Sequence, residues 1–174
     1  REQEERSTLL VSLDLSSGSN EVGLFFKGHF YDQRAIAGEE RFQSKFLPIG
    51  DVFDAAFADL GKTDAVGRGD GSPDVAEFVN AIRPKRGIEW RAHFPEPVAL
   101  DSEVYSLDTR PGVALVTTRD SRTRVDKPWD TPDRVSFARL GSQARLVWGL
   151  LARVLSAESL PANRLGRNLS FVYS

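Results

Sequence analysis

The chain has 174 residues, a formal net charge of −2 at pH 7 and 40% hydrophobic residues, which suits one globular domain spanning residues 1–174. It contains no cysteine, which excludes a disulfide framework, a zinc site built on thiolates and a cysteine nucleophile. The charge balance gives no overall positive field toward nucleic acid, and no run approaches the ~18 apolar residues that a membrane-spanning helix needs.

Residues 1–7 begin with a wholly polar run, which we expect to be a frayed terminus or the stub of a preceding segment. Apolar and polar residues then alternate over 8–15, a pattern typical of a half-buried strand. The turn-forming residues 16–20 separate this strand from a second, aromatic-rich one over 22–31. The two strands predict a β-hairpin at the N-terminal end.

Two short helices are predicted next. Asp51 suits an N-cap and Gly61 a helix stop, which predicts the first helix between them. A glycine-rich surface loop is expected over 61–72. Ser72-Pro73 then predicts the start of a second helix that ends at Pro84. Its buried side would consist of Val75, Phe78, Val79 and Ile82.

A central meander of three strands is predicted over 88–94, 103–107 and 113–118, followed by an exposed, charged loop over 119–133. The strongest periodic signal comes next, a long helix over 134–158 that Asp133 would cap. A final strand is predicted over 168–173. The helix residues expected to face the core are Phe137, Leu140, Ala144, Val147, Trp148, Leu151, Val154 and Leu155.

The long helix also carries a face of small side chains at Ala138, Ser142, Gly149 and Ala152. Small residues allow close approach, either to elements of the same domain or to another subunit. The predicted fold class is α+β. We expect a mostly antiparallel sheet, made of the N-terminal hairpin, the central meander and the C-terminal strand, packed against one long helix and two short helices.

His29 is a candidate catalytic residue, because the pKa of histidine lies near neutral pH. The tripeptide Gly28-His29-Phe30 resembles a short motif of hotdog-fold acyl-carrier dehydratases and thioesterases. The resemblance covers three residues, and it implies an acyl-thioester enzyme that uses His29. Tyr31-Asp32-Gln33 stands where that family has a Pro-Gly turn before a helix bearing an acid. The resemblance therefore stops at Phe30.

A calcium site is the metal hypothesis that the sequence offers. Asp70, Asp74 and Glu77 fall at ligand positions of an EF-hand loop if Gly71 is its sharp-turn glycine. Val66 and Arg68 would then occupy the first and third ligand positions, where neither can bind calcium. A glycine-rich loop that leads into a capped helix explains the same residues, so no metal and no cofactor is predicted.

Basic residues suggest a possible nucleic-acid interface, with Trp129 as an aromatic platform near them. Glu89, Asp120 and Asp126 lie among them and dilute the positive charge, so solvated loops explain the same segments. The candidate nucleic-acid ligands are Arg83, Lys85, Arg86, Arg119, Arg122 and Arg124.

No serine-nucleophile elbow and no phosphate-binding glycine loop occurs in the sequence. We therefore interpret the chain as a non-enzymatic binding or assembly module, a subunit of a larger complex that contacts a protein partner or a second copy of itself. The alternatives are the hotdog-like enzyme and a nucleic-acid-binding subunit.

Overall fold

The computed structural model describes residues 9–28, 39–63, 75–83, 99–107, 110–123 and 127–157. Within these residues the chain forms a four-stranded sheet, three α-helices and a 3₁₀ turn at Pro132–Arg134. The strands are β1 (Leu10–Asp14), β2 (Glu21–Phe25), β3 (Glu77–Asn80) and β4 (Gly112–Thr117); the helices are α2 (Glu39–Thr63), α3 (Asp101–Leu107) and α4 (Phe137–Ser156).

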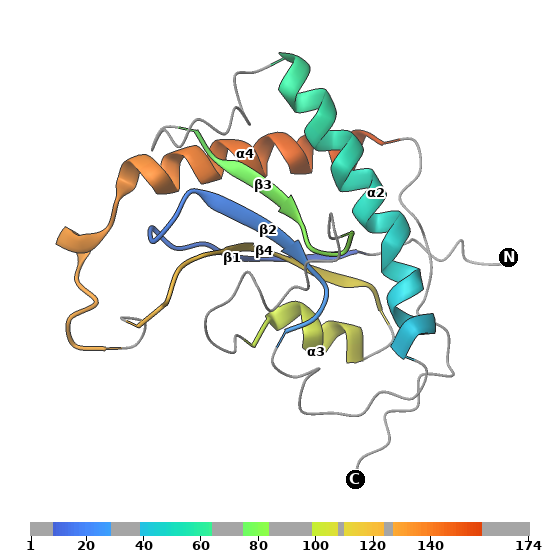
Figure 1. Ribbon diagram of the computed structural model, residues 1–174, viewed down its shortest axis with the longest axis horizontal. Coiled ribbons are helices and arrows are strands. Elements are labelled where there is room, and N and C mark those ends of the chain that lie inside the picture. The colour runs from blue at the N-terminus through green and yellow to red at the C-terminus, as the bar shows by residue number, and fades with distance from the viewer. Residues whose placement is uncertain are drawn as a thin grey trace, which may run out of the picture.

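The sheet is mixed, with the strand order β1-β4-β2-β3. The prediction of a mostly antiparallel sheet is therefore wrong, although the mixture of helices and strands is confirmed. β1 runs parallel to β4 and β2 runs parallel to β3, whereas β2 and β4 are antiparallel. Figure 1 shows the sheet between helices, with α2 and α4 on one side and α3 on the other.

The predicted N-terminal hairpin does not form, because β4 lies between β1 and β2. The connection between the two strands instead wraps the carboxyl end of β4. The Ser16 amide donates to Thr117 Oγ1 over 2.8 Å, and the Thr118 amide donates to the Glu21 carbonyl over 2.9 Å. The first predicted strand is confirmed as β1, the second is confirmed only as far as Phe25, and the predicted pairing of the two is wrong.

Two of the three strands of the predicted central meander fall on described residues, which form one helix and one strand. Residues 103–107 were expected to be extended, but they lie in α3. The Glu103 carboxylate explains this, because its Oε2 accepts the Leu100 amide over 2.9 Å and so satisfies a free donor at the start of the helix. The strand over 113–118 is confirmed as β4, and the predicted strand over 88–94 lies outside the described residues.

The predicted second short helix is also wrong, because Glu77–Asn80 forms β3 beside β2. Phe78 and Val79 suit a strand as well as a helix, and pairing with β2 decides between them. Asn80 ends the strand: its Oδ1 accepts the amides of Ile82 and Arg83, and its Nδ2 donates to the Gly50 carbonyl of α2 over 2.9 Å.

Two of the three described α-helices are long, whereas the sequence predicted only one long helix. The short helix expected after Asp51 is the second half of the 25-residue α2, which continues through Pro48. The 20-residue α4 confirms the predicted long helix, but Ser136 rather than Asp133 caps it. The predicted strand over 168–173 and the terminal residues 1–7 lie outside the described residues.

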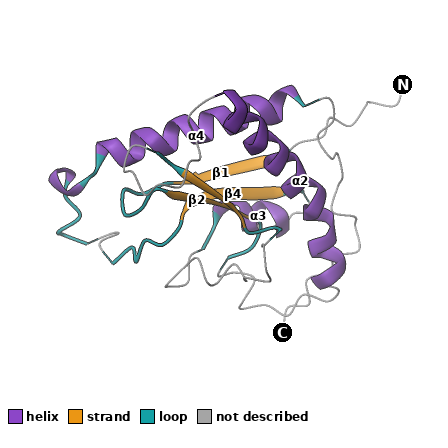
Figure 2. Ribbon diagram, turned by 45° about the horizontal axis from the view of Figure 1, so that its top comes forward, coloured by secondary structure: helices purple, strands orange, loops and turns teal. Residues whose placement is uncertain are grey.

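The main core lies between the sheet and the pair α2 and α4 (Figure 2). Phe26 at the end of β2 stacks on Phe46 of α2 with ring centroids 4.5 Å apart. A smaller apolar cluster on the opposite face includes Phe25, Leu100 and Val116, beside α3. No helix among the described residues is long and apolar enough to span a bilayer.

Candidate functional site

A polar network closes the carboxyl ends of β1 and β4, where parallel strands of an α/β sheet commonly present their functional loops. Gln143 of α4 is its centre and is fully buried. Its Nε2 donates to the carbonyls of Ser16 and Ser19 over 2.8 and 2.7 Å, and its Oε1 accepts the Thr117 hydroxyl over 2.7 Å. One side chain therefore ties α4, β4 and the loop after β1 together.

Arg139, one turn earlier in α4, makes a second connection to the same loop. Its Nη1 donates to the carbonyls of Ser17 and Gly18 over 3.2 and 3.1 Å. Together Gln143 and Arg139 fix the rotation of α4 about its own axis, because both must face the sheet to reach these carbonyls. The network thereby decides which side of α4 faces away from the protein.

The charges of this network are matched internally. Asp14 and Arg122 form an ion pair of 2.7 Å, and Arg122 also donates to the Asp14 carbonyl over 3.1 Å. Buried Glu21 accepts the Thr118 hydroxyl and pairs with Arg119 over 3.3 Å.

Asp120 accepts the Ser16 hydroxyl and the Arg122 amide, the latter over 3.1 Å. Arg119 and Arg122 have positive φ angles of 54° and 51°, so the loop after β4 is held in a conformation that costs energy. We interpret the network as the anchor of α4.

The outward side of α4 carries an apolar row that we call the outer stripe: Phe137, Ala144, Trp148 and Leu155. The spacing of seven, four and seven residues places them on one face of the helix. The exposed fractions of Phe137, Trp148 and Leu155 are 73%, 76% and 77%. These three side chains present on the order of 400 Å² of apolar surface, within the size range of patches that are often functional.

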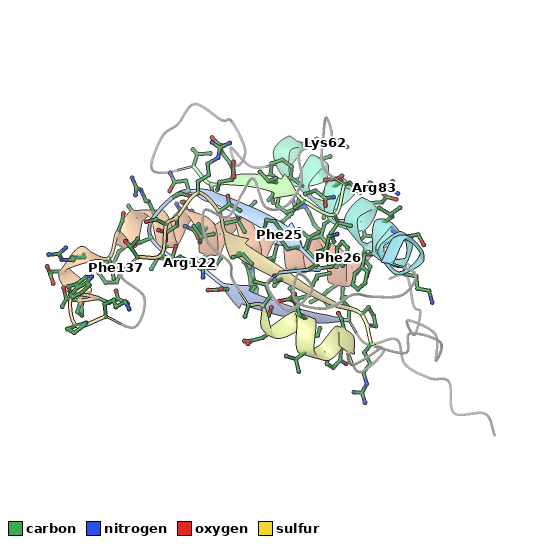
Figure 3. All side chains as sticks on the ribbon, turned by 60° about the horizontal axis from the view of Figure 1, so that its bottom comes forward. Phe25, Phe26, Lys62, Arg83, Arg122 and Phe137 are labelled. Carbon is green, nitrogen blue, oxygen red and sulfur yellow. The ribbon has the colours of Figure 1, made fainter. Side chains whose placement is uncertain are left out.

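The opposite face of α4 is buried, and it differs from the face predicted from the sequence. Val147 and Val154 are buried as expected, whereas Phe137, Trp148 and Leu155 are exposed. Figure 3 labels Phe137 at the first turn of the helix, at one extremity of the molecule. The residues that face the core are Ser142, Gln143, Leu146, Val147, Leu150 and Val154.

Charge along α4 is of one sign only. Its three charged residues are arginines, and it contains no acidic residue. Arg139 is bound by the loop after β1, and Arg153 pairs with Asp59 of α2 over 2.8 Å. Among the described residues Arg145 has no acidic partner, and its Nη1 lies 3.7 Å from the position of a Cβ at Gly141. Arg145 is therefore a cation beside Ala144 of the outer stripe that no carboxylate of the described residues neutralises.

The small-residue candidates do not share one environment. Ser142 is buried, and Gly149 packs on Leu60 of α2, whose Cδ1 lies 2.7 Å from the position of an added Cβ. Ala138 and Ala152 are exposed. Part of the predicted interface face therefore serves packing between α2 and α4 of the same chain.

The nucleic-acid candidates that the structure describes are engaged with carboxylates. Arg83 pairs with Asp51 over 2.6 Å, a contact that raises the pKa of Arg83, while Arg119 and Arg122 bind Glu21 and Asp14. Arg83 follows β3 and Arg122 follows β4, which run in opposite directions, so the two arginines lie at opposite ends of the sheet (Figure 3). Lys85, Arg86 and Arg124 lie outside the described residues.

The catalytic and metal hypotheses depend on residues that the structure does not describe: His29, Asp70 and Asp74. Glu77 lies in β3, and no group of three or more potential metal-ligating side chains occurs in the described part of the chain. The buried Glu103 has a structural role, because both of its carboxylate oxygens accept backbone amides. Its Oε1 accepts the Gly28 amide over 2.6 Å and its Oε2 accepts the Leu100 amide.

Sequence reasoning missed the outer stripe because it assigned one apolar face to a helix that has apolar residues on two. Leu146 and Leu150 fall four residues apart, in register with Val154, and they mark the inner face. The predicted core left out both leucines, although their spacing with Val154 was visible in the sequence and indicated the inner face. Comparison with known proteins returned no match to a family model, a curated protein or a solved structure.

Proposed function

We propose that the chain is a non-enzymatic binding module that docks a protein partner on the outer stripe of α4. The observation that carries the proposal is the exposure of Phe137, Trp148 and Leu155 along one face of a helix whose other face is anchored. Large exposed aromatic residues are expensive to leave in water, and they are the typical anchors of protein interfaces.

The occupant that fits the stripe best is an amphipathic helix with acidic residues beside its apolar face. A 20-residue helix is about 30 Å long, and the stripe extends over nearly all of it in a single row. One helix laid along another matches this shape. Arg145 and the absence of acidic residues from α4 favour a partner of opposite charge and disfavour pairing of two α4 helices.

A photo-cross-linking experiment tests this proposal. The chain has no cysteine, so a single cysteine at position 155 or, as a control, at the exposed Ala138 can carry a benzophenone group. In an extract of the cells that make the protein, we expect a discrete protein adduct from position 155 and none from position 138.

The substitution Trp148→Glu in the labelled chain should reduce the yield of that adduct at least ~10-fold, because hot-spot aromatics contribute roughly 2 kcal/mol or more to binding. Ala138→Glu is the matched control and should leave the yield unchanged. Equal adduct yields from positions 155 and 138 would refute a docking role for the outer stripe. An adduct yield that Trp148→Glu leaves unchanged would refute it as well.

A further inference from the structure

Within the described part of the chain, the side of β1 that faces away from β4 is a second uncovered feature, independent of the outer stripe. β1 is an edge strand in the described sheet and pairs with β4 over the register from Leu10↔Gly112 to Asp14↔Val116. The Leu10 amide donates to the Pro111 carbonyl over 3.0 Å. In a parallel ladder the N–H and C=O groups of one residue point to the same side and alternate along the strand. The backbone groups of Val11 and Leu13 therefore point away from β4.

β1 has few of the features that usually protect a sheet edge. It contains no lysine, arginine or proline, its register with β4 is unbroken by a bulge, and its one charged residue, Asp14, is paired with Arg122. Leu13 is 53% exposed, although Val11, two residues earlier on the same face, packs against the main core.

The opposite edge of the sheet is protected. β3 has only four residues and begins with Glu77. Phe78 lies against Phe57 of α2, with ring centroids 5.1 Å apart, and Asn80 binds the Gly50 carbonyl of the same helix. The two edges therefore differ among the described residues: α2 packs against β3, whereas no further strand lies beside β1.

We infer that the open edge of β1 accepts an extended strand from a partner protein, which continues the sheet beyond β1. Only an extended backbone matches the alternating donors and acceptors of Val11 and Leu13. On the α4 side the added strand would place apolar side chains beside these two residues and cover Leu13. On the α3 side it would place hydroxyl or amide side chains beside Ser12 and Asp14.

A second copy of the chain fits this edge less well. An antiparallel β1–β1 pair in which Val11 and Leu13 exchange hydrogen bonds is centred on Ser12. Leu10 of each copy would then lie opposite Asp14 of the other, whose carboxylate is held by Arg122. An apolar side chain would face an ion pair twice in the same interface. A strand of different sequence avoids both mismatches.

Amide hydrogen exchange of the full chain, followed by NMR, tests the inference with a defined probe. The probe is an acetylated and amidated peptide that copies residues 111–118, because this sequence forms a strand that already pairs in parallel with the other edge of β1. In the free, dilute chain the Val11 and Leu13 amides should exchange at least ~100-fold faster than those of Ser12 and Asp14, which are bonded to β4. Millimolar peptide should slow the Val11 and Leu13 amides at least ~10-fold in a saturable manner.

Two controls separate this site from the outer stripe. Leu13→Lys adds the kind of charge that protects natural edges and should abolish the effect of the peptide, whereas Trp148→Glu should leave it intact. The same peptide with N-methyl groups on the amides that face β1 should have no effect. Failure of the cross-linking experiment above would leave this result untouched.

Three results would overturn the inference. Slow exchange of Val11 and Leu13 in the dilute free chain would mean that the edge is already paired. Protection that increases with protein concentration in the absence of peptide would assign the edge to a second copy. Unchanged exchange up to millimolar peptide would show that the edge does not accept a strand.

Discussion

At the scale of single residues, a few buried polar side chains hold the molecule together where the apolar core ends. Gln143 binds two backbone carbonyls and one hydroxyl, and Glu103 joins Gly28 at the end of β2 to the start of α3. Buried donors and acceptors cost little when they are satisfied and much when one partner is removed. These residues should therefore be more sensitive to substitution than their polarity suggests.

Replacement of Gln143 by leucine keeps the volume but leaves the carbonyls of Ser16 and Ser19 without their Gln143 donor. We expect the free energy of unfolding to fall by about 2–4 kcal/mol, which urea denaturation measures. The control is Arg145→Gln, an exposed change two residues later that should stay within about 0.5 kcal/mol. An equally small effect of Gln143→Leu would contradict the role given to the network.

The turn before α4 offers a local electrostatic test. The Thr131 hydroxyl donates to the Asp133 carboxylate and lowers the pKa of Asp133 from its ordinary value. Because the folded pKa is the lower one, this contact stabilises the fold above the unfolded pKa, and its contribution is lost as the pH falls through the folded value. Thr131→Val should raise the pKa of Asp133, as an NMR titration would show. An unchanged pKa would mean that the hydrogen bond does not form in solution.

At the scale of elements, two contacts fix the position of α4. One is with the carboxyl ends of β1 and β4, and the other is with α2. Gly149 lets α4 lie close to Leu60 of α2, whereas Gly141 faces open space except for Arg145. The two glycines share one helix and differ in what surrounds them, which makes them a matched pair.

Gly141→Ala should raise the free energy of unfolding by about 0.5–1 kcal/mol, because alanine is the better helix former. Gly149→Ala gains the same propensity but places its Cβ 2.7 Å from Leu60 Cδ1, so the buried leucine must move. We expect no net stabilisation from that change. Thermal or urea unfolding measures the stability of both variants. An equal gain in the free energy of unfolding from the two substitutions would show that α2 and α4 are not in close contact.

An element could be predicted from the sequence when the pattern that forms it lies within its own segment. The α4 helix and the β1 and β4 strands were predicted because their patterns are regular within one segment. The β3 strand was missed because a remote partner, β2, decides it. The α3 helix was missed although its cause is local, since the Glu103 side chain binds the Leu100 amide three residues earlier. Which face of α4 is buried was misjudged because Gln143 and Arg139 have distant backbone partners.

At the scale of the whole molecule, the described residues form a sheet covered by helices on both faces, and two surfaces of this described part are left uncovered. One is the outer stripe of α4 and the other is the open edge of β1. In contrast, charged side chains at the carboxyl ends of β1 and β4 form ion pairs, Arg122 with Asp14 and Arg119 with Glu21. This distribution is the basis of the proposed role in assembly, because a protein partner can cover an apolar stripe and pair with a strand edge.

The central claim is that the outer stripe is bare in the isolated chain and covered in the assembly. Thiol labelling of single-cysteine variants tests it directly, since the natural chain contributes no thiol. In the purified chain, Ala144→Cys in the outer stripe should react about as fast as a free thiol, while Leu146→Cys on the buried face should react at least ~100-fold more slowly. In the native complex, Ala144→Cys, which keeps the aromatic anchors, should become as slow as Leu146→Cys. Rapid labelling of Ala144→Cys in both states would contradict the account.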